Sequence, residues 1–165
     1  MLNSITIQRM TIDNSEKENG IVKYSYGNSF IKISEKPQGF LAEDFAASYP
    51  GIKYIEIYDL YVDKKYRHQG IATKLVKEVI TRYEGYVILA AAGASMLEYT
   101  EEPSDEEKIK ITESLRPFWE SMGFKDINHI FAGYEFKNAY IYTGNAMGLV
   151  VYLIEQRLYQ NKNKE

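Results

Sequence analysis

The sequence lacks cysteine altogether and has only two histidines among its 165 residues. Without cysteine there is no disulfide, no thiolate metal ligand and no cysteine nucleophile, and this composition favours a protein of the reducing cytoplasm. The isolated histidines, His68 and His129, are too few to predict a histidine-rich metal site. We therefore expect a cytoplasmic protein that holds no metal ion.

Long hydrophobic runs and blocks of basic residues are also missing. The longest apolar runs are far shorter than a membrane span, and the N-terminus carries no basic segment followed by an apolar one. The net charge of -3 comes without a Lys- or Arg-rich arm, which argues against general binding to nucleic acids or anionic membranes. We expect neither of these partners.

Apolar residues, in contrast, are plentiful. With 45% hydrophobic and 14% aromatic residues, a chain of this length can bury one substantial core, so we expect a single domain over residues 1–165. The first third alternates apolar runs with turn signals, including a polar turn at 13–20, a hairpin at Gly27-Asn28 and a short helix at 40–48. Strands are expected there over residues 5–12, 21–26 and 30–34.

The middle of the chain predicts a parallel strand-helix-strand unit. The strong strand at 53–62 alternates, which places Glu56 on one face with Leu60 and Val62, and Asp59 on the other face with Tyr61. Apolar residues then recur at helical spacing over residues 69–83. A continuous apolar run, typical of a strand buried on both faces, follows over residues 86–92. Such a series predicts a parallel crossover.

The last third begins with an acidic segment at 98–107. Ser104 and Glu107 have the spacing of a capping box, so a helix is expected to start there, with Pro117 interrupting or kinking it and Gly123 ending it. Strands at 130–136 and 139–142 and a helix at 145–159 complete the expected elements.

The turn from Tyr61 to Thr73 is the most informative segment. It leaves a strand, contains an Arg-x-x-Gly-x-Ala element at Arg67–Ala72, and opens an amphipathic helix. The first amides of a helix are unpaired donors at the positive end of the helix dipole, which suits them to phosphate. We therefore expect a phosphate-bearing cofactor at this turn.

Two motifs in this order resemble those of the GNAT superfamily of acyl-CoA-dependent N-acetyltransferases. Asp59 to Ala72 resembles its acetyl-CoA-binding motif, and Pro117 to Phe124 (Pro-Phe-Trp-Glu-Ser-Met-Gly-Phe) resembles its later helix-to-strand motif. Together with the elements between them, they cover roughly residues 54–136. The resemblance implies an α/β (α+β) fold: a mixed, mostly antiparallel sheet with a parallel β-α-β crossover, flanked by helices.

The resemblance also implies how acetyl-CoA would be held. Arg67 would lie at the mouth of the pyrophosphate site, and the backbone of a strand splayed from its neighbour, at Leu60, Tyr61 and Val62, would hold the pantetheine arm. Trp119 could line the thioester channel. The amides assigned to the pyrophosphate are those of His68, Gln69, Gly70, Ile71, Ala72 and Thr73. The alternatives are close packing of helix on sheet at Gly70 and Ala72, an ordinary fully paired strand, and core packing of Trp119.

Acetyl transfer to an amine requires removal of a proton from the ammonium form. Glu56 matches the position of the catalytic glutamate in histone-acetylating relatives and is the first choice for general base. Asp59 matches an acidic residue common in the motif and would be structural or would orient the substrate. A solvated strand residue is the alternative reading for Glu56.

Two features depart from the family pattern. Many relatives carry a tyrosine that acts as the general acid where this chain has Trp119, and an indole cannot protonate the departing thiolate. Water, Ser121 or one of the tyrosines would then protonate the thiolate, or it would leave unprotonated. Only residues 13–20 are available for the helices that usually follow the first strand. The segments at 40–48 and 98–107 are candidates to replace that wall, and the acidic one would attract a cationic acceptor unless it is simply a solvated surface.

The sequence therefore predicts an N-acetyltransferase that moves an acetyl group from acetyl-CoA to a primary amine by direct attack in a ternary complex, since no cysteine can carry an acyl intermediate. The acceptor classes left open are a small-molecule amine such as an aminoglycoside, a polyamine and a protein lysine. A non-catalytic acyl-CoA-binding sensor or partner-binding module of the same fold is the alternative. A homodimer is also left open.

Overall fold

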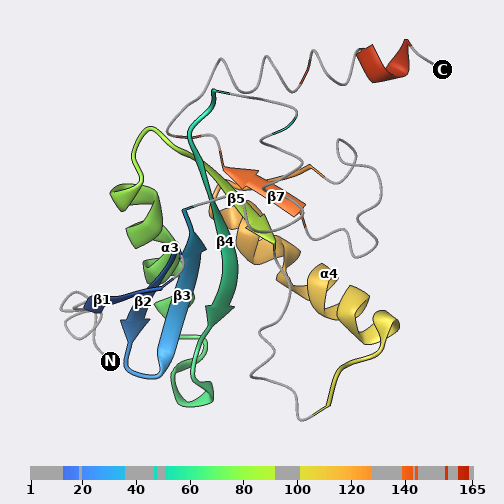
Figure 1. Cartoon of the computed structure of the whole chain (residues 1–165). Coiled ribbons are helices and arrows are strands. Elements are labelled where there is room, and N and C mark those ends of the chain that lie inside the picture. The colour runs from blue at the N-terminus through green and yellow to red at the C-terminus, as the bar shows by residue number, and fades with distance from the viewer. Residues whose placement is uncertain are drawn as a thin grey trace.

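The described part of the computed structural model comprises residues 13–18, 20–35, 47, 51–91, 101–127, 139–142, 144, 155 and 160–163. Its strands form one sheet in the order β1-β2-β3-β4-β5-β7-β6 (Figure 1). β4 and β5 are parallel, and the other neighbours are antiparallel. The strands are β1 (Asp13–Glu18), β2 (Ile21–Tyr26), β3 (Ser29–Ser34), β4 (Tyr54–Tyr61), β5 (Val87–Ala91), β6 (Lys125–Asp126) and β7 (Ala139–Tyr142).

Two α-helices with described bounds, α3 and α4, accompany this sheet. α3 (Ile71–Arg82) connects β4 to β5 as the crossover predicted from the sequence, after a short 3-10 turn, η1 (Lys64–Tyr66). α4 (Asp105–Ser121) precedes β6. The fold is thus a mixed, mostly antiparallel sheet with one parallel pair and flanking helices, as expected.

One expectation at the N-terminal end is wrong. Residues 13–20, read as a polar turn, contain β1, which pairs antiparallel with β2 from Glu18 opposite Ile21 to Asp13 opposite Ser25. A polar sequence can form this strand because β1 lies at the edge of the sheet, where backbone pairing with one neighbour does not require apolar side chains. The elements expected at 5–12, 40–48, 130–136 and 145–159 lie outside the described residues, apart from Ala47 and Glu155.

Both helices cover the same face of the sheet (Figure 1). We call it the helix face and define it by Ile31, Ile33, Ile55 and Ile57, which form one buried cluster with the inner side of α3 and with Trp119 of α4. Each fully buried aliphatic side chain of this kind contributes about 1.5–3 kcal/mol relative to exposure. The α3 residues in the cluster are Ile71, Leu75, Val76 and Val79.

α4 begins and ends where the sequence predicts. Ser104 is its N-cap and accepts a hydrogen bond from the amide of Glu107 at 3.2 Å, and Gly123 follows the helix with a φ of 90°. Pro117 lies inside the helix and does not end it, although it has no amide hydrogen for the carbonyl four residues earlier. Burial of Trp119, two residues further on, offsets that loss, because the helix must continue to place this side chain in the core.

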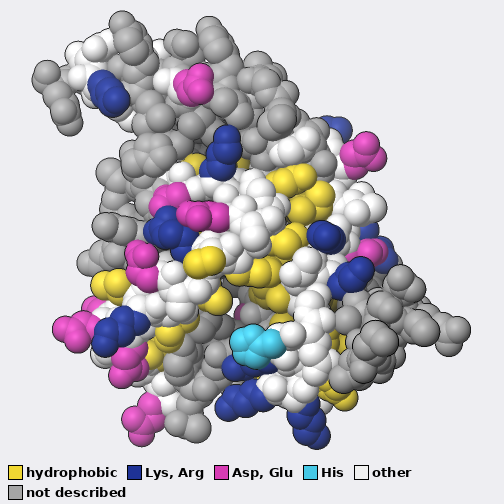
Figure 2. Space-filling model, turned by 180° about the vertical axis from the view of Figure 1, so that it is seen from behind, with side chains coloured by type: hydrophobic (Ala, Val, Ile, Leu, Met, Phe, Trp, Pro, Cys, Tyr) yellow, Lys and Arg dark blue, Asp and Glu magenta, His cyan; other side chains and the backbone are white. Residues whose placement is uncertain are grey.

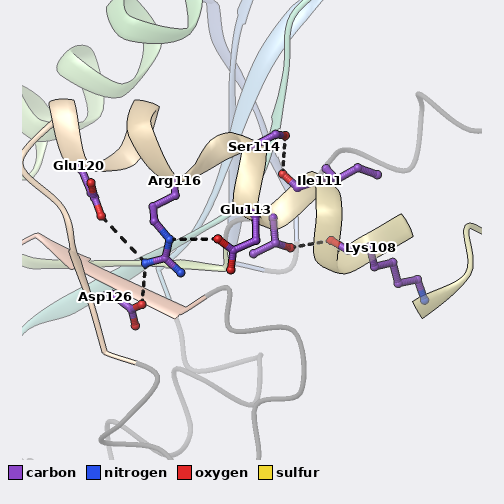
Figure 3. A network of polar contacts seen from close by, with 8 residues as sticks. Lys108, Ile111, Glu113, Ser114, Arg116, Glu120 and Asp126 are labelled. Atoms are coloured by element: carbon purple, nitrogen blue, oxygen red, sulfur yellow. Dashed lines mark hydrogen bonds and ion pairs between the residues drawn. The ribbon is translucent and has the colours of Figure 1, made fainter. Parts of the chain in front are cut away.

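An ion-pair cluster fastens α4 to the edge of the sheet (Figure 3). The Arg116 guanidinium lies 2.8 Å from the carboxylate of Asp126 in β6, and it also approaches Glu113 at 3.6 Å and Glu120 at 4.0 Å. The neighbouring carboxylates raise the pKa of Arg116, chiefly through the hydrogen bond to Asp126. These contacts hold the C-terminal half of α4 against β6.

Candidate active site

The turn between β4 and α3 is built on Asp63. Its carboxylate accepts a hydrogen bond from the amide of Lys65 at 3.1 Å, and its carbonyl accepts one from the amide of Tyr66 at 2.8 Å. The Arg67 side chain folds back and donates from Nε to the carbonyl of Val62 at 3.1 Å. The chain therefore leaves the strand in a defined conformation before the helix starts.

Residues of the β2–β3 hairpin stabilise this turn through hydrogen bonds to Asp63. Ser29, which is fully buried, accepts a hydrogen bond at its Oγ from the amide of Asp63 at 2.9 Å. The Asn28 side-chain amide donates to the Asp63 carboxylate at 3.3 Å. The amide of Lys65 and the Asn28 side chain lower the pKa of Asp63. The sequence predicted the Gly27-Asn28 hairpin, but nothing in it indicated that Asn28 and Ser29 contact the turn 34 or 35 residues later.

The start of α3 has the features of an anion site. His68 and Gly70 both have left-handed backbone conformations, with φ of 61° and 82°. The first intrahelical hydrogen bond runs from the amide of Lys74 to the carbonyl of Gly70, so the amides of Ile71, Ala72 and Thr73 have no partner within the helix. No acidic residue occupies the first turn. These donors are therefore available to a phosphate group.

Gly70 is open. A methyl group there would meet no atom within 4 Å, so its role is not close packing of helix on sheet. Its positive φ instead favours glycine, because other residues are strained in this conformation. The open position agrees with close approach of a ligand to the backbone. Ala72 is half-buried, and the side chain of Ile71 belongs to the core.

Positive charge gathers around this helix start. Figure 2 shows Lys and Arg side chains beside the histidine, at the end of a hollow lined by apolar side chains. The exposed side chains of Lys64, Lys65, His68 and Lys74 come from the turn and the first helical turn, and Arg67 is half-buried among them. Gln69 is half-buried and donates to the carbonyl of Lys65 at 3.4 Å. The one acidic residue of the turn, Asp63, already has its hydrogen-bond partners.

The parallel pair β4–β5 stops halfway along β4. Its register runs from Tyr54 opposite Val87 to Ile57 opposite Ala90, whereas β4 continues to Tyr61 and stays paired with β3. Within the described residues, the backbone from Tyr58 onward thus has no partner strand on its β5 side. This is the arrangement expected of a strand that holds an extended ligand.

A β-bulge in β4 overturns the predicted division of its side chains. Ile57 and Asp59 pair with consecutive β3 residues, Ile33 and Lys32, so Tyr58 is an extra residue in β4. Such an insertion shifts the alternation by one position. Beyond the bulge, the predicted faces are therefore reversed.

The bulge changes which side chains share a sheet face with the candidate base Glu56. Asp59 and Tyr61 lie opposite Lys32 and Phe30 and share the face of Glu56, which we call the opposite face. The rings of Phe30 and Tyr61 confirm this, with centroids 5.6 Å apart. The side chains of Leu60 and Val62, expected beside Glu56, instead pack against the core on the helix face.

Glu56 is buried in the middle of the sheet, with 3% of its surface exposed. Its backbone neighbours are Ser34 in β3 and Leu89 in β5. No hydrogen bond or ion pair between described residues reaches its carboxylate, and burial raises the pKa of Glu56 from 4.5 to about 7. A carboxylate with such a pKa can accept a proton near neutral pH.

Trp119 is a core residue, with 3% of its surface exposed. Its ring makes edge contacts with Phe118 at 5.2 Å and Phe124 at 5.0 Å, and it stacks on Tyr140 at 6.2 Å. Core packing, the alternative reading of this residue, accounts for these contacts. Ser121, another candidate acid, donates its hydroxyl hydrogen to the carbonyl of Phe118 at 2.6 Å.

The acidic segment before α4 has local roles in its described part. Lys108 pairs with Glu102 at 2.9 Å, and Asp105, Glu106 and Glu107 occupy the first turn, where negative charge favours the helix dipole. Across the described ranges no group of His, Asp or Glu side chains is arranged to hold a metal ion. None of the helices described there is both long and apolar enough to cross a membrane.

Comparison with known proteins identifies a family model that covers most of this region. The family model described as "Acetyltransferase (GNAT) domain" matches residues 27–126, more than half of the chain. A solved structure of a candidate GNAT-family acetyltransferase from Desulfovibrio desulfuricans is 14% identical with a TM-score of 0.37, over 73% of this chain and 64% of that one, less than two thirds of its length. No curated protein matches the sequence.

Proposed function

Because this chain belongs to the GNAT family of acetyltransferases, we propose that it transfers an acetyl group from acetyl-CoA to a primary amine, by direct attack within a ternary complex. The observation that carries the proposal is the meeting of two features at one end of β4. The parallel ladder to β5 ends at Ile57, and the turn that follows leads to unpaired helix amides at an open glycine.

The residues present fit acetyl-CoA. The amides from His68 to Thr73 and the basic side chains of the turn, Arg67 among them, would hold the pyrophosphate. The free side of β4 at Leu60, Tyr61 and Val62 would pair with the pantetheine arm. When bound, acetyl-CoA supplies the acetyl group as an activated thioester.

Glu56 is the base in this proposal. Its pKa of about 7 allows the carboxylate to be ionised in a large fraction of molecules near neutral pH and still basic enough to take a proton from an ammonium group. Asp59, on the same face, would attract and orient the ammonium form of the acceptor. We infer that solvent or a tyrosine returns a proton to the leaving thiolate, unless the thiolate leaves unprotonated, because Trp119 cannot and the Ser121 hydroxyl is engaged.

The test is release of free thiol from acetyl-CoA across a panel of small amines, polyamines and lysine peptides. Turnover with any amine supports the proposal. Tight CoA binding without turnover would instead favour the second candidate function, a non-catalytic sensor or partner-binding module. This candidate is supported by Trp119, which stands where many family members have the acidic tyrosine. A chain that does not bind CoA at all would refute both.

A further inference from the structure

The turn before α3 contains a strained residue at the proposed pyrophosphate site. His68 has a φ of 61°, and the described residues contain no other non-glycine residue with a positive φ. A side chain in this conformation costs free energy, and such residues persist only where the surrounding structure fixes them. The His68 side chain is exposed, so its own packing does not fix it. Contacts of other residues must therefore hold this part of the turn.

Residues on both sides of the strained position are tied to the chain that precedes it. Before it, Arg67 donates from Nε to the carbonyl of Val62 at 3.1 Å. After it, the side-chain amide of Gln69 donates to the carbonyl of Lys65 at 3.4 Å. A displacement of the segment between these two carbonyls would therefore change the backbone at the strained position.

Three residues, Asn28, Ser29 and Asp63, fix that segment, and we call them the Asp63 cluster. The amide of Asp63 donates to the Ser29 hydroxyl oxygen at 2.9 Å, and the Asn28 side chain donates to the Asp63 carboxylate at 3.3 Å. The same carboxylate accepts the amide of Lys65 at 3.1 Å. Ser29 is fully buried at the start of β3. The cluster therefore anchors the turn to a strand of the sheet.

Asp63 is unfavourable for an anion site on grounds of charge alone. The Lys65 amide and the Asn28 side chain lower its pKa most, and the charges of Lys65 and Arg67 add to this effect. The carboxylate is thus within electrostatic reach of Arg67, whose positive charge it counteracts. A carboxylate that opposes the attraction of phosphate to this turn indicates a geometric role.

We propose that the Asp63 cluster positions the phosphate turn, which makes the tip of the β2–β3 hairpin a functional part of the acetyl-CoA site. Its hydrogen bonds hold His68 in the left-handed conformation and thereby direct the amides that follow toward the pyrophosphate. The three residues act through the backbone of the turn, so they are positioning residues. The inference rests on the proposed function and extends its cofactor site to a second segment of the chain.

Asp63→Ala gives the sharpest test, because charge and position predict opposite results. Loss of a negative charge alone should tighten acetyl-CoA binding, whereas loss of the cluster should weaken it about tenfold, as one hydrogen bond to a charged group provides. Calorimetric titration measures this affinity, and KM for acetyl-CoA should rise while kcat at saturation is unchanged. Glu84→Ala removes an exposed carboxylate beyond the other end of α3 and should leave the affinity unchanged. Equal or tighter binding by Asp63→Ala would overturn the inference.

An exchange of the two polar side chains tests their pairing. Asn28→Asp places two carboxylates against each other and should weaken acetyl-CoA binding about tenfold or more. Adding Asp63→Asn restores a carboxylate–amide pair with the original net charge and should recover most of the affinity. Asn161→Asp, the same change at an exposed residue near the C-terminus, is the matched control and should have no effect. Thermal unfolding shows that each variant is folded. A double variant as weak as Asn28→Asp would refute the pairing.

The conformation of His68 is measured without ligand. Its NMR coupling constant between the amide hydrogen and Hα depends on φ, and it should change in both Asp63→Ala and Asn28→Asp as the left-handed population falls. Glycine adopts a positive φ without strain. Adding His68→Gly to Asp63→Ala should therefore recover part of the lost affinity, and no recovery would refute the link to His68.

The outcomes separate this inference from the proposed function. An unchanged coupling constant of His68 in both variants would overturn the inference and leave the acetyltransferase proposal standing. If the wild type binds no CoA, the proposed function fails. The coupling constants then decide alone: a change in both variants supports the positioning of the turn by the Asp63 cluster, and no change refutes it.

Discussion

Replacing Glu56 by glutamine should make the fold more stable at pH 8 and impair catalysis. The buried carboxyl has a pKa of about 7 in the folded protein against 4.5 when freely solvated. The folded state therefore binds this proton more tightly than the unfolded state does. The resulting stabilisation is fully present below pH 4.5 and is lost as the pH rises through 7, and the difference corresponds to about 3 kcal/mol.

Glutamine has nearly the same shape and does not ionise. The free energy of unfolding of Glu56→Gln minus that of the wild type should therefore be larger at pH 8 than at pH 4.5. The increase in this difference should reach up to about 3 kcal/mol. Urea unfolding at pH values from 4.5 to 8 measures this directly, followed by the fluorescence of Trp119, the single tryptophan. Glu84→Gln, which removes an exposed carboxylate, is the control. A difference that does not change with pH would refute the reasoning from burial.

The same variant tests the catalytic role. In the wild type kcat/KM should rise with pH through about 7, as Glu56 loses its proton. Glu56→Gln should lower kcat by about 100-fold or more and abolish this pH dependence, because a general base contributes roughly 100- to 10,000-fold. Affinity for acetyl-CoA should be kept. An unchanged pH profile in the variant would assign the base elsewhere.

Two further substitutions address the cofactor site. Gly70→Ala should lower the free energy of unfolding by about 1–2 kcal/mol through its positive φ and should weaken acetyl-CoA binding about tenfold. The control Gly51→Ala, at a similar φ, should lower stability only. Equal acetyl-CoA affinities of the two variants in calorimetric titration would exclude Gly70 from the site. Trp119→Phe should lower the free energy of unfolding by about 2 kcal/mol, measured by circular dichroism, and leave acetyl-CoA affinity unchanged, because Trp119 packs in the core. A clear loss of affinity in that variant would place Trp119 in the thioester channel instead.

The elements with strong periodicity could be predicted from the sequence. α3 repeats its apolar residues at helical spacing, and β5 is a continuous apolar run, so both lie within two residues of their expected bounds. β1 could not be predicted in this way, because an edge strand needs no alternation of apolar side chains. Pro117 indicated a break that the packing of Trp119 overrides.

The candidate site was predictable in position but not in its details. Arg67 and Gly70 locate the turn by their spacing alone. The face of Asp59 depends on the bulge at Tyr58, and alternation carries no signal for an inserted residue. The support from Asn28 is a contact between segments distant in sequence, which local pattern does not encode. The raised pKa of Glu56 likewise depends on burial by residues outside its own strand.

The early end of the β4–β5 ladder has a consequence for solubility. From Tyr58 onward β4 presents backbone donors and acceptors inside a sheet, in the described residues, as an edge strand does at its margin. Unpaired strand edges are templates for association with other chains. A ligand that pairs with this segment would occupy these donors and acceptors and so prevent such association. We therefore expect the protein without acetyl-CoA to aggregate more readily on storage than the protein saturated with it.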